Sequence, residues 1–267
     1  MKKSLTLFLT LIFSGSMFAQ DLRTQLETDY QQFVDAVKNK DGDKLKNVVS
    51  SAYYLNTKNE LISAQVKFPD GFFASAPRMV YDLKKETFVK AFANGTTANS
   101  IYYGKDAFGS ESLLILRFIK ENEQWKFYNA QNKLSQDILA KCKAGDTTFL
   151  KTKDFYPDGN APAVPAEITS IDFKATLDLF CEGYSVKIKI NGIEQPGTDK
   201  TTNDIVVLGG VKKGTNTIEI TATPITGKTM QRVMISIAKV VNTQEYEVFS
   251  MEDTALPASI VKQFTVN

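Results

Sequence analysis

The residues that usually carry catalysis are scarce in this sequence. Its 267 residues include no histidine, which excludes Ser-His and Cys-His nucleophilic catalysis, histidine-based zinc sites and the usual general base at neutral pH. Two cysteines, Cys142 and Cys181, are too few for a thiolate metal cluster. Any catalysis would depend on Asp, Glu, Lys or Tyr. We therefore predict no catalytic residue, no metal site and no cofactor.

Two short motifs resemble ligand-binding loops but are better explained as turns. Gly209 and Gly214 have the spacing of a phosphate-binding loop, yet Thr215 stands where such a loop needs its lysine. The stretch 41–43 (Asp-Gly-Asp) lacks the later ligands of a calcium loop. It predicts a turn, with Asp43 as the N-cap of a short helix.

The N-terminus has the pattern of a secretory signal peptide. Lys2 and Lys3 precede an apolar stretch from Leu5 to Phe13, and Ala19 supplies a small residue before the expected cut. This apolar stretch is too short to span a membrane, and no later stretch approaches that length. We expect cleavage near Ala19/Gln20, export to the periplasm or the extracellular space, and a mature chain that is peripheral to a membrane at most.

The charge distribution argues against nucleic acid as a partner. The whole chain has 32 basic and 30 acidic residues, and loss of residues 1–19 removes two lysines and leaves 30 of each. Before Pro157 the mature chain has 20 basic and 17 acidic residues, and the reverse excess of three acids follows it. Neither half has the basic surplus that binding to a phosphate backbone requires.

The two cysteines both fit a role as small core residues. Cys142 lies one helical turn after Ile138, and Cys181 continues the alternating apolar series of Leu177 and Leu179. Export would permit a disulfide between them. Spacing alone does not bring two cysteines together, so their pairing stays open.

The first half is organised around a β-hairpin from Ser112 to Leu134. Two apolar segments flank the polar tetrad 121–124, and this pattern is typical of strand, turn and strand. The first arm is apolar on both faces, as in the middle of a covered sheet. In the second arm, strict alternation would put four residues on one face. These are Trp125, Phe127, Asn129 and Gln131.

Apolar periodicity predicts the elements around this hairpin. An amphipathic helix is expected over Asp21–Lys38, a short helix after Asp43, a helix within Pro77–Phe92 with Asp82 as a cap, a strand at Ser100–Gly104, and a last helix after Ser135. Two regions are expected to be non-helical. Tyr53–Leu55 and Leu61–Phe68 predict strand or irregular connection, and Phe72 and Phe73 a loop.

This order of helices, strand and hairpin resembles the nuclear transport factor 2-like superfamily, a cone-shaped α+β fold. The matching residues are the first helix leading into 39–45 (NKDGDKL) and the entry to the last strand at 123–127 (EQWKF). The resemblance covers about residues 20–145, and we expect the domain to span residues 20–153. It implies helices packed on a curved antiparallel sheet, whose concave face encloses a pocket.

The second half of the chain has a different residue pattern, with a proline-rich stretch followed by short strand-like segments. Residues 154–165 (DFYPDGNAPAVP) have the composition of an exposed, proline-rich linker. Residues 166–267 carry about seven short strand-like segments separated by turn residues, which predicts an all-β sandwich. The first of these segments is Ile168–Phe173. The phrases at 189–192 (KING) and 213–218 (KGTNTI) look like those of immunoglobulin-like and carbohydrate-binding domains of exported proteins.

The resemblance places a candidate ligand pocket in the cone. We expect its lining to include five residues, and its ligand to be a small apolar molecule or a protein partner. The five are Tyr102, Arg117, Trp125, Asn129 and Gln131. The alternative is that the aromatic residues simply fill the core. Members of the superfamily also dimerise, which would make the sheet a homodimer interface.

Three functions compete on this evidence. The leading hypothesis is an exported, non-enzymatic binding or interaction protein. The second is a carboxylate-dependent isomerase, cyclase or hydrolase of the cone superfamily, although the chain lacks the histidine such enzymes often pair with an aspartate. The third is a carbohydrate-binding or cell-surface adhesion module. Past Pro165 there is no Trp and only Tyr184 and Tyr246, which is little for stacking on sugars.

Overall fold

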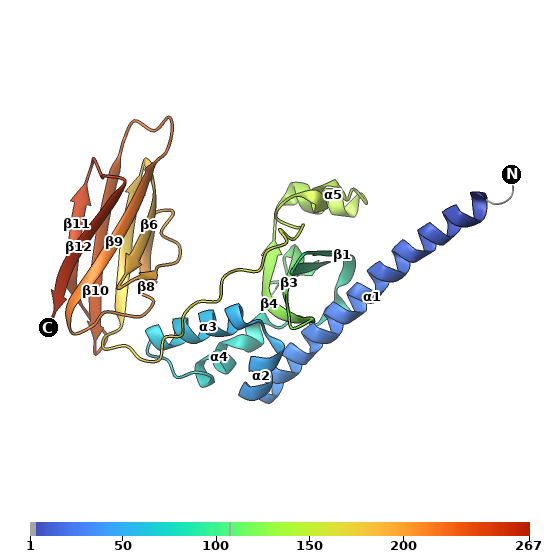
Figure 1. Cartoon of the computed structure of the whole chain (residues 1–267), viewed down its shortest axis with the longest axis horizontal. Coiled ribbons are helices and arrows are strands. Elements are labelled where there is room, and N and C mark those ends of the chain that lie inside the picture. The colour runs from blue at the N-terminus through green and yellow to red at the C-terminus, as the bar shows by residue number, and fades with distance from the viewer. Residues whose placement is uncertain (1–3, 107) are drawn as a thin grey trace. The chain divides into compact units, whose positions relative to one another are not determined.

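The computed structural model describes residues 4–106 and 108–267, which form an α+β chain with antiparallel sheets (Figure 1). The chain divides into two compact units. The first unit holds the residues up to Leu55 together with Phe72–Pro165, and the second holds Asn56–Gly71 together with Ala166–Asn267. Strands make up most of the second unit, as the sequence predicts.

The first unit is built on one antiparallel sheet with its strands in chain order. These are β1 (Thr87–Asn94), β2 (Thr97–Lys105), β3 (Glu111–Glu121) and β4 (Gln124–Lys133). The predicted hairpin is β3 with β4, and the predicted strand at Ser100–Gly104 lies within β2. Asn122 and Glu123 turn the hairpin with φ of 50° and 64°. Positive φ at both central residues is the type I′ geometry that matches the twist of paired strands.

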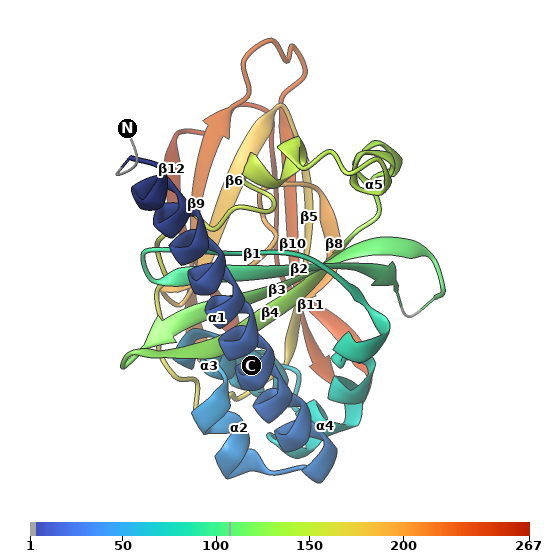
Figure 2. The ribbon, with the colours of Figure 1, turned by 90° about the vertical axis from the view of Figure 1, so that its right-hand side faces the viewer.

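Helix α1 (Ser4–Asn39) crosses one face of this sheet (Figure 2). The predicted helix Asp21–Lys38 forms its C-terminal part, with Tyr30 and Phe33 in the buried stripe. The Phe33 ring stacks on Phe127 with the centroids 4.2 Å apart, and Tyr30 lies 5.4 Å from the same ring. Phe118 adds a further ring at 6.1 Å from Phe127. Aromatic side chains therefore occupy the space between helix and sheet.

Two helices follow, and their starts correct the sequence analysis. Helix α2 (Gly42–Val48) is capped by Asp41, whose Oδ1 accepts a hydrogen bond from Lys44 N at 2.9 Å, and not by Asp43. Helix α3 (Ser51–Ser63) replaces the strand or connection predicted at Tyr53–Leu55, and it includes the first residues of the second such region, Leu61–Phe68. The Ser50 hydroxyl accepts a hydrogen bond from Tyr53 N at 3.2 Å. This N-cap starts α3 and outweighs the β propensity of the tyrosines.

The next stretch reverses two further predictions. Phe72 and Phe73 are buried in the short helix α4 (Asp70–Ser75) and do not form a loop. The helix predicted within Pro77–Phe92 is wrong, because only the single 3-10 turns η1 (Ala76–Met79) and η2 (Leu83–Lys85) precede strand β1. Asp82 does act as a cap, but for η2, where its Oδ1 accepts from Lys84 N at 3.3 Å. Pairing of β1 with β2 decides the conformation of this stretch.

The opposite face of the sheet is covered by α5 (Gln136–Lys143), η3 (Thr148–Lys151) and residues 152–162, here called the strap. A hydrophobic core lies between the sheet and these three segments. Its buried residues are Ile101, Leu113 and Ile115 with Leu139, Phe149, Leu150 and Phe155. Phe155 and Pro157 are buried, and the Phe155 carbonyl accepts a hydrogen bond from Asn99 Nδ2 at 2.8 Å. The prediction that this segment is an exposed joint is therefore wrong for these two residues.

The second unit contains two antiparallel four-stranded sheets, in the orders β11-β10-β5-β8 and β12-β9-β6-β7. Their strands are β5 (Ala175–Glu182), β6 (Tyr184–Ile190), β7 (Ile193–Glu194), β8 (Thr202–Val206), β9 (Gly214–Pro224), β10 (Arg232–Val241), β11 (Gln244–Asp253) and β12 (Ser259–Val266). Alternate residues of both sheets form one hydrophobic core. The strand predicted at Ile168–Phe173 is wrong, because only Phe173 forms an isolated bridge there and the regular strand begins at Ala175.

Residues 56–71 pack with the β strands of the second unit. The buried Asn59 side chain donates to the Ala166 carbonyl at 2.9 Å and accepts from Ile168 N at 2.8 Å. Ser63 Oγ accepts from Gly209 N at 2.9 Å. Gly209 therefore lies in a turn that a hydrogen bond to Ser63 holds in place. The sequence analysis predicts such a turn here in place of a phosphate-binding loop. Cys142 and Cys181 are both free thiols.

Candidate functional site

A β-bulge in β4 decides which predicted site residues meet. The register between β3 and β4 shifts between Arg117 and Phe118, so that Phe118 pairs with Phe127 while Arg117 pairs with Asn129. Neighbouring residues on a strand face opposite sides, and so must their partners. Strict alternation from Trp125 to Gln131 is therefore wrong. Phe127 faces α1, whereas Asn129 lies on the opposite face with Arg117.

Three of the five predicted pocket residues come together at this bulge. Arg117 Nη2 donates to Gln131 Oε1 at 3.0 Å, and Asn129 is the cross-strand partner of Arg117. Tyr102 lies elsewhere, because its hydroxyl donates to Glu27 Oε1 at 3.0 Å on the side of the sheet that faces α1. That hydroxyl is buried, and burial raises the pKa of Tyr102.

Trp125 is also separate from Arg117. Only 7% of its surface is exposed, and the Lys120 ammonium lies 6.0 Å from its ring. The residue borders a hollow of about 500 Å³ between α1, α2 and β4, together with Asp29 and Lys126. Burial raises the pKa of the Asp29 carboxyl, and the Lys126 charge partly offsets this effect. Tyr102 and Trp125 therefore belong to the packing of the first unit, as the core alternative predicts.

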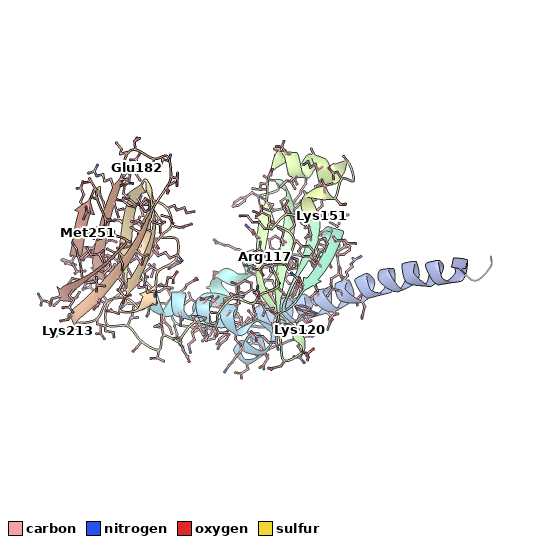
Figure 3. All side chains as sticks on the ribbon, turned by 45° about the horizontal axis from the view of Figure 1, so that its top comes forward. Arg117, Lys120, Lys151, Glu182, Lys213 and Met251 are labelled. Atoms are coloured by element: carbon pink, nitrogen blue, oxygen red, sulfur yellow. The ribbon has the colours of Figure 1, made fainter. Side chains whose placement is uncertain are left out.

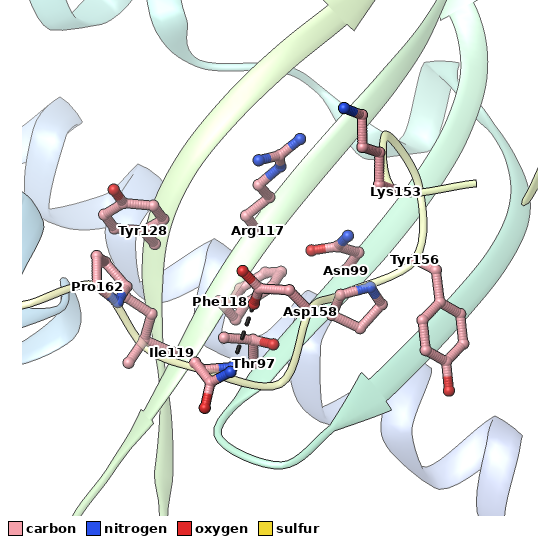
Figure 4. Close-up of a pocket in the computed structure, with 12 residues that line it drawn as sticks. Thr97, Asn99, Arg117, Phe118, Ile119, Tyr128, Lys153, Tyr156, Asp158 and Pro162 are labelled. Atoms are coloured by element: carbon pink, nitrogen blue, oxygen red, sulfur yellow. Dashed lines mark hydrogen bonds between the residues drawn. The ribbon is translucent and has the colours of Figure 1, made fainter. Parts of the chain in front are cut away.

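Arg117 lies at the floor of a pocket of about 280 Å³ on the face away from α1 (Figures 3 and 4). The sheet supplies its floor and the strap supplies its rim. The floor residues are Thr97, Asn99, Arg117, Phe118, Ile119 and Tyr128, and the rim residues are Lys153, Tyr156, Pro157, Asp158, Asn160 and Pro162. All of them belong to the first unit.

The strap is fastened to the sheet at several points beside this pocket. Asn99 Nδ2 donates a hydrogen bond to the Phe155 carbonyl, and Asn94 Nδ2 donates to the Pro157 carbonyl at 3.0 Å. Gly159 N donates to Thr97 Oγ1 at 3.0 Å. These hydrogen bonds fix the backbone of the rim relative to the floor, so the pocket is preformed.

The Arg117 guanidinium keeps unused hydrogen-bond donors. Nη2 donates to Gln131 Oε1 and, at 3.3 Å, to the Asp154 carbonyl. Nε is buried and has no partner among the described residues, and no described carboxylate lies within 4.0 Å of the guanidinium. An arginine has five N–H donors and a permanent charge. The two Nη1 donors and one positive charge are therefore left for another group, while the Nε N–H is unpaired but buried.

The surrounding charges leave this pocket positive. Asp154 is paired with Lys133, with 3.2 Å between Oδ2 and Nζ, so it does not neutralise Arg117. Lys153 and Asp158 are both exposed at the rim and offset each other. The Asp158 carboxylate also accepts a hydrogen bond from Asn160 N at 3.2 Å (Figure 4). The net excess is one positive charge, which suits a single anionic group.

The pocket lining holds polar and aromatic side chains but no cysteine or serine. Among the described residues, no cluster of three acids or cysteines could hold a metal ion. The strap residues were missed as site residues because prolines and glycine indicate a linker. Phe155, an apolar residue among them, was the one signal that the segment packs.

Comparison with known proteins gives no relative for this chain. No family model, no curated protein and no solved structure matches it. Among the described residues, no helix is both long and apolar enough to cross a membrane.

Proposed function

We propose that this chain is an exported, non-enzymatic binding protein whose Arg117 pocket holds a small ligand or a short segment of a partner. The observation that carries the proposal is a half-buried arginine at the floor of a preformed pocket, whose buried Nε and whose Nη1 donate to no described residue. A buried donor without a partner is costly, and natural proteins rarely keep one without a reason. A ligand bound in the pocket would supply an acceptor for the Nη1 donors beside this buried Nε.

The fold we propose for the two units supports this function. Helices on an antiparallel sheet in the first unit agree with the nuclear transport factor 2-like cone, and two sheets around one core in the second agree with an immunoglobulin-like β-sandwich. Both architectures commonly serve as binding scaffolds, although function belongs to sites and not to folds. Export rests on the signal-like sequence of residues 1–19.

A fragment screen followed by heteronuclear NMR tests the proposal. Uniformly labelled mature chain is mixed with a library of small polar and apolar fragments. We expect backbone amide shifts to change at Asn99, Ile119, Tyr128 and Asn160, which surround the pocket. If every fragment that binds changes only amides elsewhere, or if none binds, the proposed function is wrong.

A further inference from the structure

We infer that the ligand of the Arg117 pocket is an organic monocarboxylate with a flat apolar tail, its carboxylate bound by Arg117 and its tail lying against Tyr128. This inference rests on the proposed function and names the chemical class of its ligand. It follows from three properties of the pocket, namely its donors, its charge and its walls.

The donors select a carboxylate as the head group. Hydrogen bonds between a charged donor and an ionised acceptor are about twice as strong as neutral ones, and a carboxylate supplies acceptor oxygens together with the opposite charge. In this protein Gln131 and the Asp154 carbonyl occupy both N–H groups of Nη2, and Nε is buried, so the Nη1 donors are the ones left for a carboxylate oxygen. Asn99 is already committed to the Phe155 carbonyl, so Arg117 is the main donor for the head group.

The charge selects one negative charge over two. Arg117 and Lys153 are the basic residues that line the pocket, and Asp158 is the acid that lines it. A dianionic phosphate would have to lie close to the Asp158 carboxylate with only one excess positive charge to balance it. A carboxylate brings one charge, and it can bind at the floor, away from the exposed Asp158 at the rim.

The walls select an organic tail over an inorganic anion. Tyr128 and Ile119 line the pocket from the sheet, with Pro162 of the strap beside Tyr128 (Figure 4), and Pro157 also belongs to the lining. Aromatic and proline surfaces favour contact with a flat apolar group. The volume of about 280 Å³ lies below the 300–1,000 Å³ that is typical of pockets for drug-sized ligands. The ligand should therefore be small, of the size of an arylacetic acid.

The bulge at Tyr128 connects these properties. Without the extra residue in β4, Asn129 would face α1 and Tyr128 would pair in the regular ladder. The bulge leaves Asn129 Oδ1 buried beside Arg117 without a hydrogen-bond partner. The bulge thereby places Tyr128 in the wall of the pocket beside Arg117, while the two unsatisfied atoms, Arg117 Nε and Asn129 Oδ1, are buried in the sheet.

The Arg117 side chain itself can report on binding. The chain has four arginines, so protein labelled with ¹⁵N-arginine gives few Nε–H signals, and the signal lost in Arg117→Gln identifies Arg117. The labelled mature protein is titrated separately with phenylacetate, phenylacetamide and inorganic phosphate. Phenylacetamide has the same shape as phenylacetate without its charge, and phosphate has charge without a tail.

We expect phenylacetate to shift the Arg117 Nε–H signal saturably and phenylacetamide to bind about tenfold more weakly, since hydrogen bonds to charged groups are about twice as strong as neutral ones. Phosphate should bind more weakly than phenylacetate. Arg117→Gln should abolish phenylacetate binding measured by ligand-observed NMR, and Arg117→Lys should retain part of it. The matched control Arg78→Gln removes an exposed arginine outside the pocket and should leave binding unchanged.

Three results would overturn the inference. Equal binding of phenylacetamide would exclude recognition of the carboxylate, and tighter binding of phosphate would exclude the organic tail. Failure of all three compounds to shift Arg117 would exclude this ligand class. If library fragments nevertheless shift the amides around the pocket, the proposed function stands and only the ligand class is wrong. If they too fail, both are wrong.

Discussion

Phe155 anchors the strap to the sheet, and its removal should destabilise the first unit strongly. The side chain is fully buried, and its ring meets Phe149 edge to face with the centroids 5.0 Å apart. Truncation of a buried phenylalanine to alanine costs about 3–5 kcal/mol. With a urea m-value of about 2 kcal/mol per M, Phe155→Ala should lower the midpoint of unfolding by about 1.5–2.5 M.

Trp125 provides the assay. It is the only tryptophan in the chain and is 93% buried in the first unit, so its emission should shift to the red when that unit unfolds. Val164→Ala is the matched control, because Val164 lies in the same proline-rich stretch but is 52% exposed. Its effect should stay within about 0.5 kcal/mol.

The comparison of these two variants decides whether the strap is packed. If Phe155→Ala unfolds at the same urea concentration as Val164→Ala, the stretch is an exposed linker and the pocket has no fixed rim. Phe155→Leu covers the case in which the alanine variant does not fold. It keeps most of the apolar volume and should give a midpoint between those of the wild type and Phe155→Ala.

Three further outcomes are expected. Burial raises the pKa of Asp29 above 3.8, so the folded state binds its proton more tightly than the unfolded state and stability falls as pH rises through the folded pKa. Asp29→Asn should therefore stabilise the protein at pH 7 and have no effect well below pH 3.8, and an equal effect in urea titrations at both pH values would contradict this. Both cysteines should react with a thiol reagent after unfolding without reductant, and a yield below two thiols per chain would indicate a disulfide. N-terminal sequencing of exported protein should begin near Gln20, whereas an intact N-terminus would contradict the signal peptide.

Elements defined by a clear local pattern could be predicted from the sequence. The stripe of Tyr30 and Phe33 indicates a helix, and the apolar arms around 121–124 indicate a hairpin, because burial of one face imposes its period on the sequence. Helix α3 was missed because its start depends on the Ser50 cap and its tyrosines favour strands. Strand β1 was missed because pairing with β2, which is a tertiary contact, decides its conformation.

The candidate site was predictable only in part, for a related reason. Arg117, Asn129 and Gln131 were grouped because the cone resemblance implies a pocket lined by this part of the hairpin. The structure pairs Arg117 with Asn129 and hydrogen-bonds it to Gln131, but of the three only Arg117 lines the pocket. The bulge that moves Trp125 to the other face adds one residue to one strand and leaves no signature in the alternation of β4. The strap could not be placed, since a fold-back of residues 152–162 onto β2 depends on long-range hydrogen bonds such as that from Asn99.

A crystal structure of the mature protein grown with saturating phenylacetate tests the central claim most directly. The account predicts electron density for the ligand in the Arg117 pocket, with a carboxylate oxygen within hydrogen-bond distance of the guanidinium and the ring against Tyr128. Density for the ligand between α1 and the sheet, or an Arg117 pocket filled only by water, would contradict it.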